Sequence, residues 1–200
     1  MSGAATSPAS APALVLASTS PRRRELLARI GLVPARLAAP DIDETPLKGE
    51  RPRDYVARLA EGKARAVSRA SDEVVLAGDT TVAAGRRILE KPVDEADLRD
   101  MLALLSGRRH RVWSGICVIG RDDRVRVRIV DTIVAFKVLS AEEIDAYVAC
   151  GEGMGKAGGY AIQGRAETFV RFLSGSHSNV VGLPLFETRA LLTSVGVPLG

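Results

Sequence analysis

One carboxylate interrupts a segment that otherwise has the composition of a buried strand. Residues 74–77 are apolar, Asp79 follows after one glycine, and residues 82–84 are apolar again. Burying a carboxylate is costly unless the charge is paired with a cation or binds a metal ion. Asp79 is therefore the leading candidate for a general base or a metal ligand. The alternative is an aspartate at a sheet edge that makes a turn contact.

Three consecutive arginines, Arg22, Arg23 and Arg24, lie where a helix is predicted to begin. Ser20 followed by proline is typical of a helix start, so the arginines fall in its first turn. Cations there oppose the helix dipole unless an anion is bound. Free backbone N–H groups and the hydroxyl groups of Ser18 and Ser20 would complete a phosphate site. A solvated basic turn is the alternative, and no Walker-type phosphate loop is present.

Two lysines and a glutamate extend this set of candidates. Lys63 falls on the apolar face of a helix predicted over residues 53–70, although a side chain that reaches solvent is an open alternative. Lys91 follows the predicted hairpin that contains Asp79 and is a second candidate partner for phosphate. Glu44 lies in an acidic loop and is a weaker candidate. Carboxylate oxygens are the ligands that a hard cation such as magnesium requires.

A glycine-rich segment over residues 156–164 carries a single amide side chain, Gln163. An amide offers both a donor and an acceptor, which allows it to recognise the edge of a base. Glycines give the backbone the freedom to approach a ligand, but the same composition is also typical of a structural loop. His110, His177, Cys117 and Cys150 form no HExxH or CxxC pattern, so we expect packing or surface roles for all four.

The overall composition favours a globular protein with a small anionic ligand. The chain has 200 residues, 46% of them hydrophobic, and a net charge of +4. Its pI of 9.4 raises nucleic-acid binding as an alternative, but the charges are interspersed and only 4% of residues are aromatic. No segment has the length of a membrane span or the pattern of a secretion signal. We therefore expect a cytoplasmic protein with no nucleic-acid or membrane partner.

The hydropathy pattern predicts an α/β domain with a mixed sheet over residues 13–200, preceded by a disordered tail over residues 1–12. The order begins with a strand over 14–17 and a helix from Pro21 to about Gly31. Strands that form hairpins alternate with helices along the rest of the chain. The predicted strands are 74–84, 87–90, 111–119, 125–136, 169–173 and 179–181; the further helices are 53–70, 94–105, one capped by Ser140 that ends at Ala149, and one after Pro184.

Taken together, these segments resemble the Maf family of nucleoside triphosphate pyrophosphatases from Leu14 to about Leu192. The resemblance rests on separate motifs that occur in the family's order, at residues 16–23, 78–80, 90–92, 105–110, 156–164 and 180–185. It implies an elongated mixed sheet with a cleft between two lobes, similar to that of the inosine triphosphate pyrophosphatases. Two departures stand out: glycines at 153 and 155 replace a usual proline and aspartate, and His177 replaces a usual tyrosine.

The resemblance also implies roles for the candidate residues. The aspartate matching Asp79 is the family's proton acceptor, and the residues that line its phosphate and metal site match Ser18, Arg22, Arg23, Glu44, Lys63 and Lys91. The branch of the family that acts on dTTP and UTP carries the residues found here as Arg22, Thr80 and Gln163. The branch that acts on 7-methyl-GTP has tryptophan, glutamine and glutamate instead.

The expected activity is hydrolysis of dTTP and UTP to the monophosphate and pyrophosphate, with magnesium or manganese as the divalent metal. Asp79 and Glu44 are the expected metal ligands, and the oligomeric state is left open, with homodimers common among resembling proteins. Three alternatives stay open: a different base preference such as 7-methyl-GTP, a septum-formation inhibitor that acts mainly by binding, and a nucleic-acid-binding module.

Overall fold

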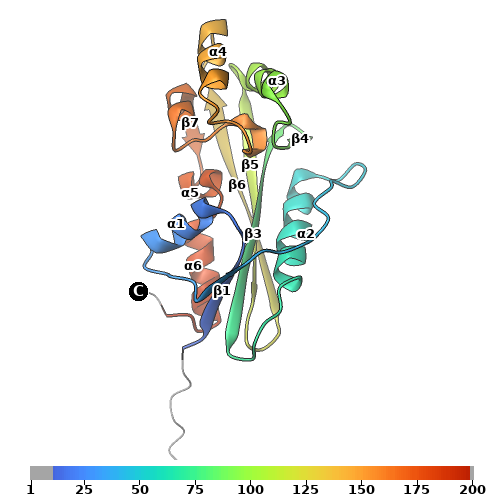
Figure 1. Ribbon diagram of the computed structural model, residues 1–200, viewed down its shortest axis with the longest axis vertical. Helices are drawn as coiled ribbons and strands as arrows, with labels where there is room; N and C mark the ends of the chain where they lie inside the picture. Colours follow the sequence, from blue (N-terminus) through green and yellow to red (C-terminus); the bar gives the residue numbers. More distant parts are fainter. Residues whose placement is uncertain (1–10, 199–200) are drawn as a thin grey trace, which may run out of the picture.

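The computed structural model describes residues 11–198 of the chain, and a single sheet of seven strands runs through them (Figure 1). The strand order is β2-β1-β3-β5-β6-β7, with β4 paired to β3. β1 pairs in parallel with β2 and β3, and all other pairs are antiparallel, so the predicted mixed sheet is confirmed. The strands are β1 (Ala13–Ala17), β2 (Arg36–Ala38), β3 (Glu73–Ala84), β4 (Arg87–Leu89), β5 (Arg109–Ile119), β6 (Val125–Phe136) and β7 (Val170–Ser174).

Helices cover both faces of the sheet. The long helix α2 lies on one side of it, and α1, α5 and α6 lie on the other, while α3 and α4 gather at one end (Figure 1). Two short 3-10 turns, η1 (Ala157–Gly159) and η2 (Arg165–Phe169), precede β7. The helices are α1 (Pro21–Arg29), α2 (Pro52–Arg65), α3 (Glu95–Leu105), α4 (Ala141–Ala149), α5 (His177–Val181) and α6 (Leu185–Ser194).

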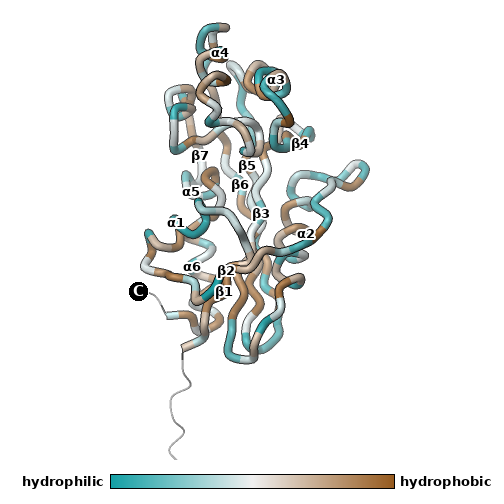
Figure 2. Tube along the Cα trace, in the orientation of Figure 1, coloured by the Kyte–Doolittle hydropathy of each residue, from teal (hydrophilic) through white to brown (hydrophobic). Residues whose placement is uncertain are grey.

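The alternation of side chains along β1 supplies apolar contacts to both faces of the sheet. Leu14 and Leu16 join the larger core on the side of α1, whereas Val15 and Ala17 face the small residues of α2. Gly115 marks the closest approach of α2, because a Cβ atom there would lie 2.2 Å from the carbonyl oxygen of Val56. Hydrophobic residues gather in the part of the sheet around β1, and many of the loops are hydrophilic (Figure 2).

Several local predictions are confirmed. β1 begins at Ala13, and Ser140 caps α4 as predicted. The cap is a capping box, in which Ser140 accepts from the N–H of Glu143 and the Glu143 carboxylate accepts from the N–H of Ser140. The β5–β6 hairpin turns at Asp123, whose positive φ of 58° suits a tight turn. The predicted tail lies outside the described residues up to residue 10. Within residues 11–198, no helix is long and apolar enough to cross a membrane.

Other predictions were wrong in detail. The helix predicted to reach residue 70 ends at Arg65, because side chains hold the backbone of the next segment: Arg36 donates to the Ser68 carbonyl, and the Glu73 carboxylate accepts from the N–H of Ala70. Residues 179–181 belong to α5 and form no strand, since Ser176 caps that helix by accepting from the N–H of Asn179. Ser20 starts α1 but makes no side-chain capping bond, and the short strand β2 was missed.

An aromatic cluster fills the core at the end of the sheet near α4. Phe136 meets Tyr160 and Phe169 edge-on, and the His110 ring lies against Phe136. His110 is 2% exposed, its Nε2 lies 2.8 Å from the Tyr160 hydroxyl, and burial lowers its pKa to about 4. The packing role predicted for this histidine is therefore confirmed. Both cysteines are free thiols, as expected.

Candidate active site

A cavity of about 730 Å³ opens beside the middle of β3. β1 pairs with β3 only as far as Ala77, and β4 pairs with it only from Val82 onward. The residues between them therefore have no strand neighbour on that side within the described chain, and the cavity occupies this gap. All ten site residues predicted from the sequence line the cavity: Ser18, Ser20, Arg22, Arg23, Glu44, Lys63, Asp79, Thr80, Lys91 and Gln163.

The gap in the sheet holds a buried ion pair. Lys63 Nζ lies 2.7 Å from Asp79 Oδ1 and 2.8 Å from Glu44 Oε2. Lys63 and Asp79 are 7% and 6% exposed, so the lysine does not extend into solvent. Within residues 11–198, Asp79 lies where β3 has no strand neighbour on one side, as a sheet-edge residue does, but its carboxylate pairs with Lys63 and makes no turn contact. The ammonium group instead compensates the charge of the buried carboxylate.

Glu44 lies on a loop, and helix α2 holds this loop in place. The Tyr55 hydroxyl donates to the Glu44 carbonyl at 3.0 Å, and Arg58 donates to the Thr45 carbonyl at 3.1 Å. Arg58 also forms a two-pronged ion pair with Glu50. Tyr55 lines the cavity but was not predicted as a site residue, because a tyrosine on the apolar face of a helix reads as part of the core.

Arg23 is a half-buried cation with no ion pair to a carboxylate among residues 11–198. Its Nε donates to the Gly182 carbonyl at 2.9 Å, and its other nitrogens donate to the hydroxyls of Ser18 at 3.1 Å and Thr80 at 3.5 Å. Burial lowers the pKa of Arg23, and the negative charge of Asp79 partly offsets that effect. A guanidinium held by neutral oxygens keeps its positive charge available to an anion in the cavity.

Further cations make the cavity electropositive. Burial lowers the pKa of Arg22 and the pKa of Lys156. The nearby positive charge of Arg22 lowers the pKa of Lys156 further. Arg24 is exposed and does not line the cavity. Lys156 was missed as a site residue, since its segment was interpreted through its glycines and Gln163. The lining carries five cations against three carboxylates: Arg22, Arg23, Lys63, Lys91 and Lys156 against Glu44, Asp79 and Glu90.

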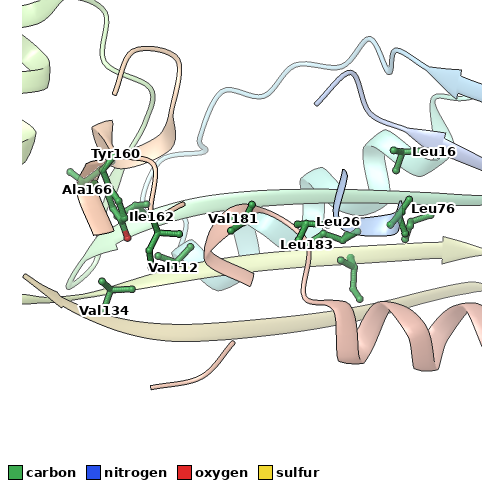
Figure 3. Close-up of a cluster of buried hydrophobic side chains, with 14 of the residues drawn as sticks. Leu16, Leu26, Leu76, Val112, Val134, Tyr160, Ile162, Ala166, Val181 and Leu183 are labelled. Atoms are coloured by element: carbon green, nitrogen blue, oxygen red, sulfur yellow. The ribbon is translucent and has the colours of Figure 1, made fainter. Parts of the chain in front are cut away.

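Part of the cavity lining is apolar. Val112, Tyr160 and Val181 line the cavity and belong to one buried apolar cluster (Figure 3), and the exposed Gln163 also lines the cavity. Thr80 also lines the cavity, with its hydroxyl 2.8 Å from the Ser114 hydroxyl and 3.3 Å from the Gly182 carbonyl. A lining that combines cations, apolar side chains and a few polar groups matches the two chemical halves of a nucleotide.

The oxygen donors of the cavity fit one class of metal ion. Residues 11–198 contain no group of three or more His, Cys, Asp and Glu side chains arranged to hold a metal. Two carboxylates, however, reach the same Lys63 nitrogen and face the cavity. Magnesium is commonly held by one or two carboxylates together with substrate phosphates and water, and seldom by protein ligands alone. This pair of carboxylates therefore fits a magnesium ion.

Comparison with known proteins identifies the family. The family model described as "Maf-like protein" matches residues 13–195. The chain belongs to the Maf family. Among the relatives of this Maf-family chain, a dTTP/UTP pyrophosphatase of Sphingopyxis alaskensis is 84% identical over 94% of this chain and 100% of the relative. Another dTTP/UTP pyrophosphatase, of Novosphingobium aromaticivorans, is 61% identical over 98% of each chain. A solved HAM1 protein from Coxiella burnetii is 17% identical, covers 92% of this chain and 99% of that chain, and has a TM-score of 0.48.

Proposed function

We propose that this protein is a cytoplasmic nucleoside triphosphate pyrophosphatase that hydrolyses dTTP and UTP to the monophosphate and pyrophosphate. The observation that carries the proposal is the buried Asp79–Lys63 pair, joined by the exposed Glu44, in a nucleotide-sized cavity that several further cations line. The relatives named above supply the substrate class. The free thiols of Cys117 and Cys150 are consistent with a reducing compartment.

In the proposed reaction, a water molecule attacks the α-phosphorus and Asp79 accepts its proton. The new bond joins the water oxygen to the α-phosphorus, the bond from that phosphorus to the bridging oxygen breaks, and pyrophosphate leaves. Four cations of the lining neutralise the phosphate oxygens and hold the triphosphate in position for in-line attack by water: Arg22, Arg23, Lys91 and Lys156. Glu44 and Asp79 would hold a divalent cation, which supplies further charge neutralisation when bound.

The base preference is proposed from three residues that line the cavity. Arg22, Thr80 and Gln163 match the residues of the branch that acts on dTTP and UTP. The amide of Gln163 provides a donor and an acceptor for the mixed edge of uracil or thymine. A wild-type preference for 7-methyl-GTP would contradict this assignment of the base.

The replacement Asp79→Asn tests the proposal. The amide nearly preserves the shape of the carboxylate but cannot accept a proton from water, so we expect pyrophosphate release from UTP to fall at least ~100-fold. Asp100→Asn, at an exposed position on α3, is the matched control and should leave the rate unchanged. Circular dichroism should show the same fold for both variants. Near-normal turnover by a folded Asp79→Asn protein would place the base elsewhere.

A further inference from the structure

Tyr147 on α4 and Glu152, which follows α4, hold the loop that carries Gln163. The Tyr147 hydroxyl accepts from the N–H of Ala161 at 3.1 Å. The Glu152 carboxylate accepts from the N–H of Arg165 with both oxygens, at 2.9 and 3.2 Å. Gln163 lies midway between these two attachment points. The backbone on either side of it is therefore fixed by one neutral and one charged acceptor.

The Gln163 side chain itself contributes nothing to this attachment. It is exposed, and it makes no hydrogen bond to any of residues 11–198. The apolar residues around it, Tyr160, Ile162 and Ala166, point into the core (Figure 3). The position of the amide is consequently decided by the backbone of the loop, and Glu152 is the charged group that touches this backbone.

We propose that Glu152 is a positioning residue that sets the location of Gln163 and thereby the selectivity for the base. The inference rests on the proposed function, because it requires that Gln163 contact the base of the substrate. A site that recognises a base by hydrogen bonds loses discrimination when its donor and acceptor move out of register. Glu152 does not line the cavity, so its effect reaches the substrate through the loop.

Gly164 makes this contact sterically possible. A Cβ atom at Gly164 would lie 1.8 Å from Glu152 Oε1 and 2.4 Å from Glu152 Cδ. The φ angle of Gly164 is −121°, so the backbone there does not itself require glycine. The absence of a side chain at residue 164 therefore serves to admit the carboxylate of Glu152 against the loop.

Two glycines that follow Glu152, Gly153 and Gly155, shape the segment that carries it. A Cβ atom at Gly153 would lie 2.4 Å from the Gly159 carbonyl oxygen and 2.8 Å from Leu98 Cδ1. Gly153 thus allows the segment to pack closely against η1 and α3. Gly155 has a positive φ of 70°, which glycine adopts without strain. Of the two glycines that depart from the usual family pattern, Gly153 therefore permits close packing of the segment that carries Glu152, and Gly155 permits its turn.

The replacement Glu152→Ala tests the proposal through the ratio of kcat/KM for UTP to kcat/KM for CTP. UTP and CTP differ only at the edge of the base, so a general loss of folding or of phosphate binding leaves this ratio unchanged. We expect the ratio to fall about tenfold, mainly through UTP, since one mismatched buried hydrogen bond has an effect of that size. Glu152→Gln, which can still accept one hydrogen bond, should give a smaller decrease. Glu167→Ala, an exposed glutamate on η2, is the matched control and should leave the ratio unchanged.

A second replacement, Gly164→Ala, displaces the same carboxylate from the other side. We expect it to lower the UTP to CTP ratio as Glu152→Ala does, and the double variant to be no worse than either single variant. Equal losses for UTP and CTP in Glu152→Ala, or additive effects in the double variant, would overturn the positioning role. Wild-type protein that releases no pyrophosphate from UTP would instead overturn the proposed function, and the inference with it.

Discussion

Arg22 and Arg24 are two residues apart but have different surroundings. Arg22 is partly buried and lines the cavity beside Lys156, whereas Arg24 is exposed on the outer side of α1. The helix start predicted from Ser20 and Pro21 placed all three arginines in one turn, and it could not tell which of them faces the cavity. The separation arises from the packing of α1 against the sheet through Leu26 and Leu27, which fixes the face of the helix turned toward the cavity.

This difference makes Arg24 a natural control for Arg22. Arg22→Ala should lower kcat/KM for UTP about tenfold or more, because a charge-assisted contact with phosphate is lost. Arg24→Ala should lower it less than twofold. Steady-state kinetics at saturating magnesium measure both effects. Equal small losses would support a solvated basic turn in place of a phosphate site.

The ion pair of Lys63 leads to a prediction about stability. Lys63→Met leaves the Asp79 carboxylate buried without its cation, and we expect the free energy of unfolding to fall by about 3 kcal/mol. Adding magnesium should restore part of this loss, since the two carboxylates regain a positive charge between them. Lys48→Met, at an exposed loop position, is the control. Urea denaturation with and without magnesium provides the measurement, and unchanged stability in Lys63→Met would contradict the pairing.

At the scale of elements, hydropathy patterns predicted the long strands and the helices that pack on them, and they failed where tertiary contacts decide the backbone. Strands β3, β5 and β6 carry long apolar patterns and were predicted within two residues at each end. The three-residue strand β2 has no pattern of its own, because it exists only through its pairing with β1. Residues 179–181 are apolar enough for a strand, but Asn179 turns inward and donates to the Val112 carbonyl, which fixes the helix α5 against the sheet.

His110 on β5 is buried against Tyr160, which precedes Gln163, and this burial leads to a prediction about stability in acid. Burial lowers the pKa of His110 from 6.5 to about 4, so the unfolded chain binds a proton more readily between these values. The stabilisation by the neutral ring is present above pH 6.5 and is lost as the pH falls toward 4, by roughly 3 kcal/mol in total. His110→Gln should remove this part of the pH dependence. His177→Gln, at the exposed start of α5, should retain it.

Chemical denaturation between pH 4 and pH 7 measures these differences. The wild type and His177→Gln should lose stability in parallel over this range, while the curve for His110→Gln should be flatter. A parallel loss in all three proteins would show that other groups account for the acid sensitivity.

At the scale of the whole molecule, the cavity gathers segments that are far apart in the chain. Its lining runs from Ala17 through Asp79 to Gly182, and it includes the loop of Gln163. The sequence motifs predicted each of these segments separately. Their meeting point could not be predicted from the motifs themselves, because it depends on the gap that β1 and β4 leave along β3.

Because the cavity is lined by segments that are far apart in the chain, we expect a bound nucleotide to stabilise the whole described fold. We propose that residues 13–200 form one domain, since one sheet includes all seven strands of the described chain. A non-hydrolysable UTP analogue at 100 times its Kd should add about 2.7 kcal/mol to the free energy of unfolding. Calorimetry should then show a single transition that moves to higher temperature as a whole. Two transitions, of which only one moves, would contradict the single domain.

Lys63 gives the two carboxylates of the site a cation that belongs to the chain itself. In proteins whose acidic or thiolate groups rely on an outside ion, folding depends on the supply of that ion. Here the internal ammonium group lies against both carboxylates, so the site has its own cation whether or not an outside ion is bound. We therefore expect a chelator to stop the proposed metal-dependent activity while the protein stays folded, and the activity to return when the ion is restored.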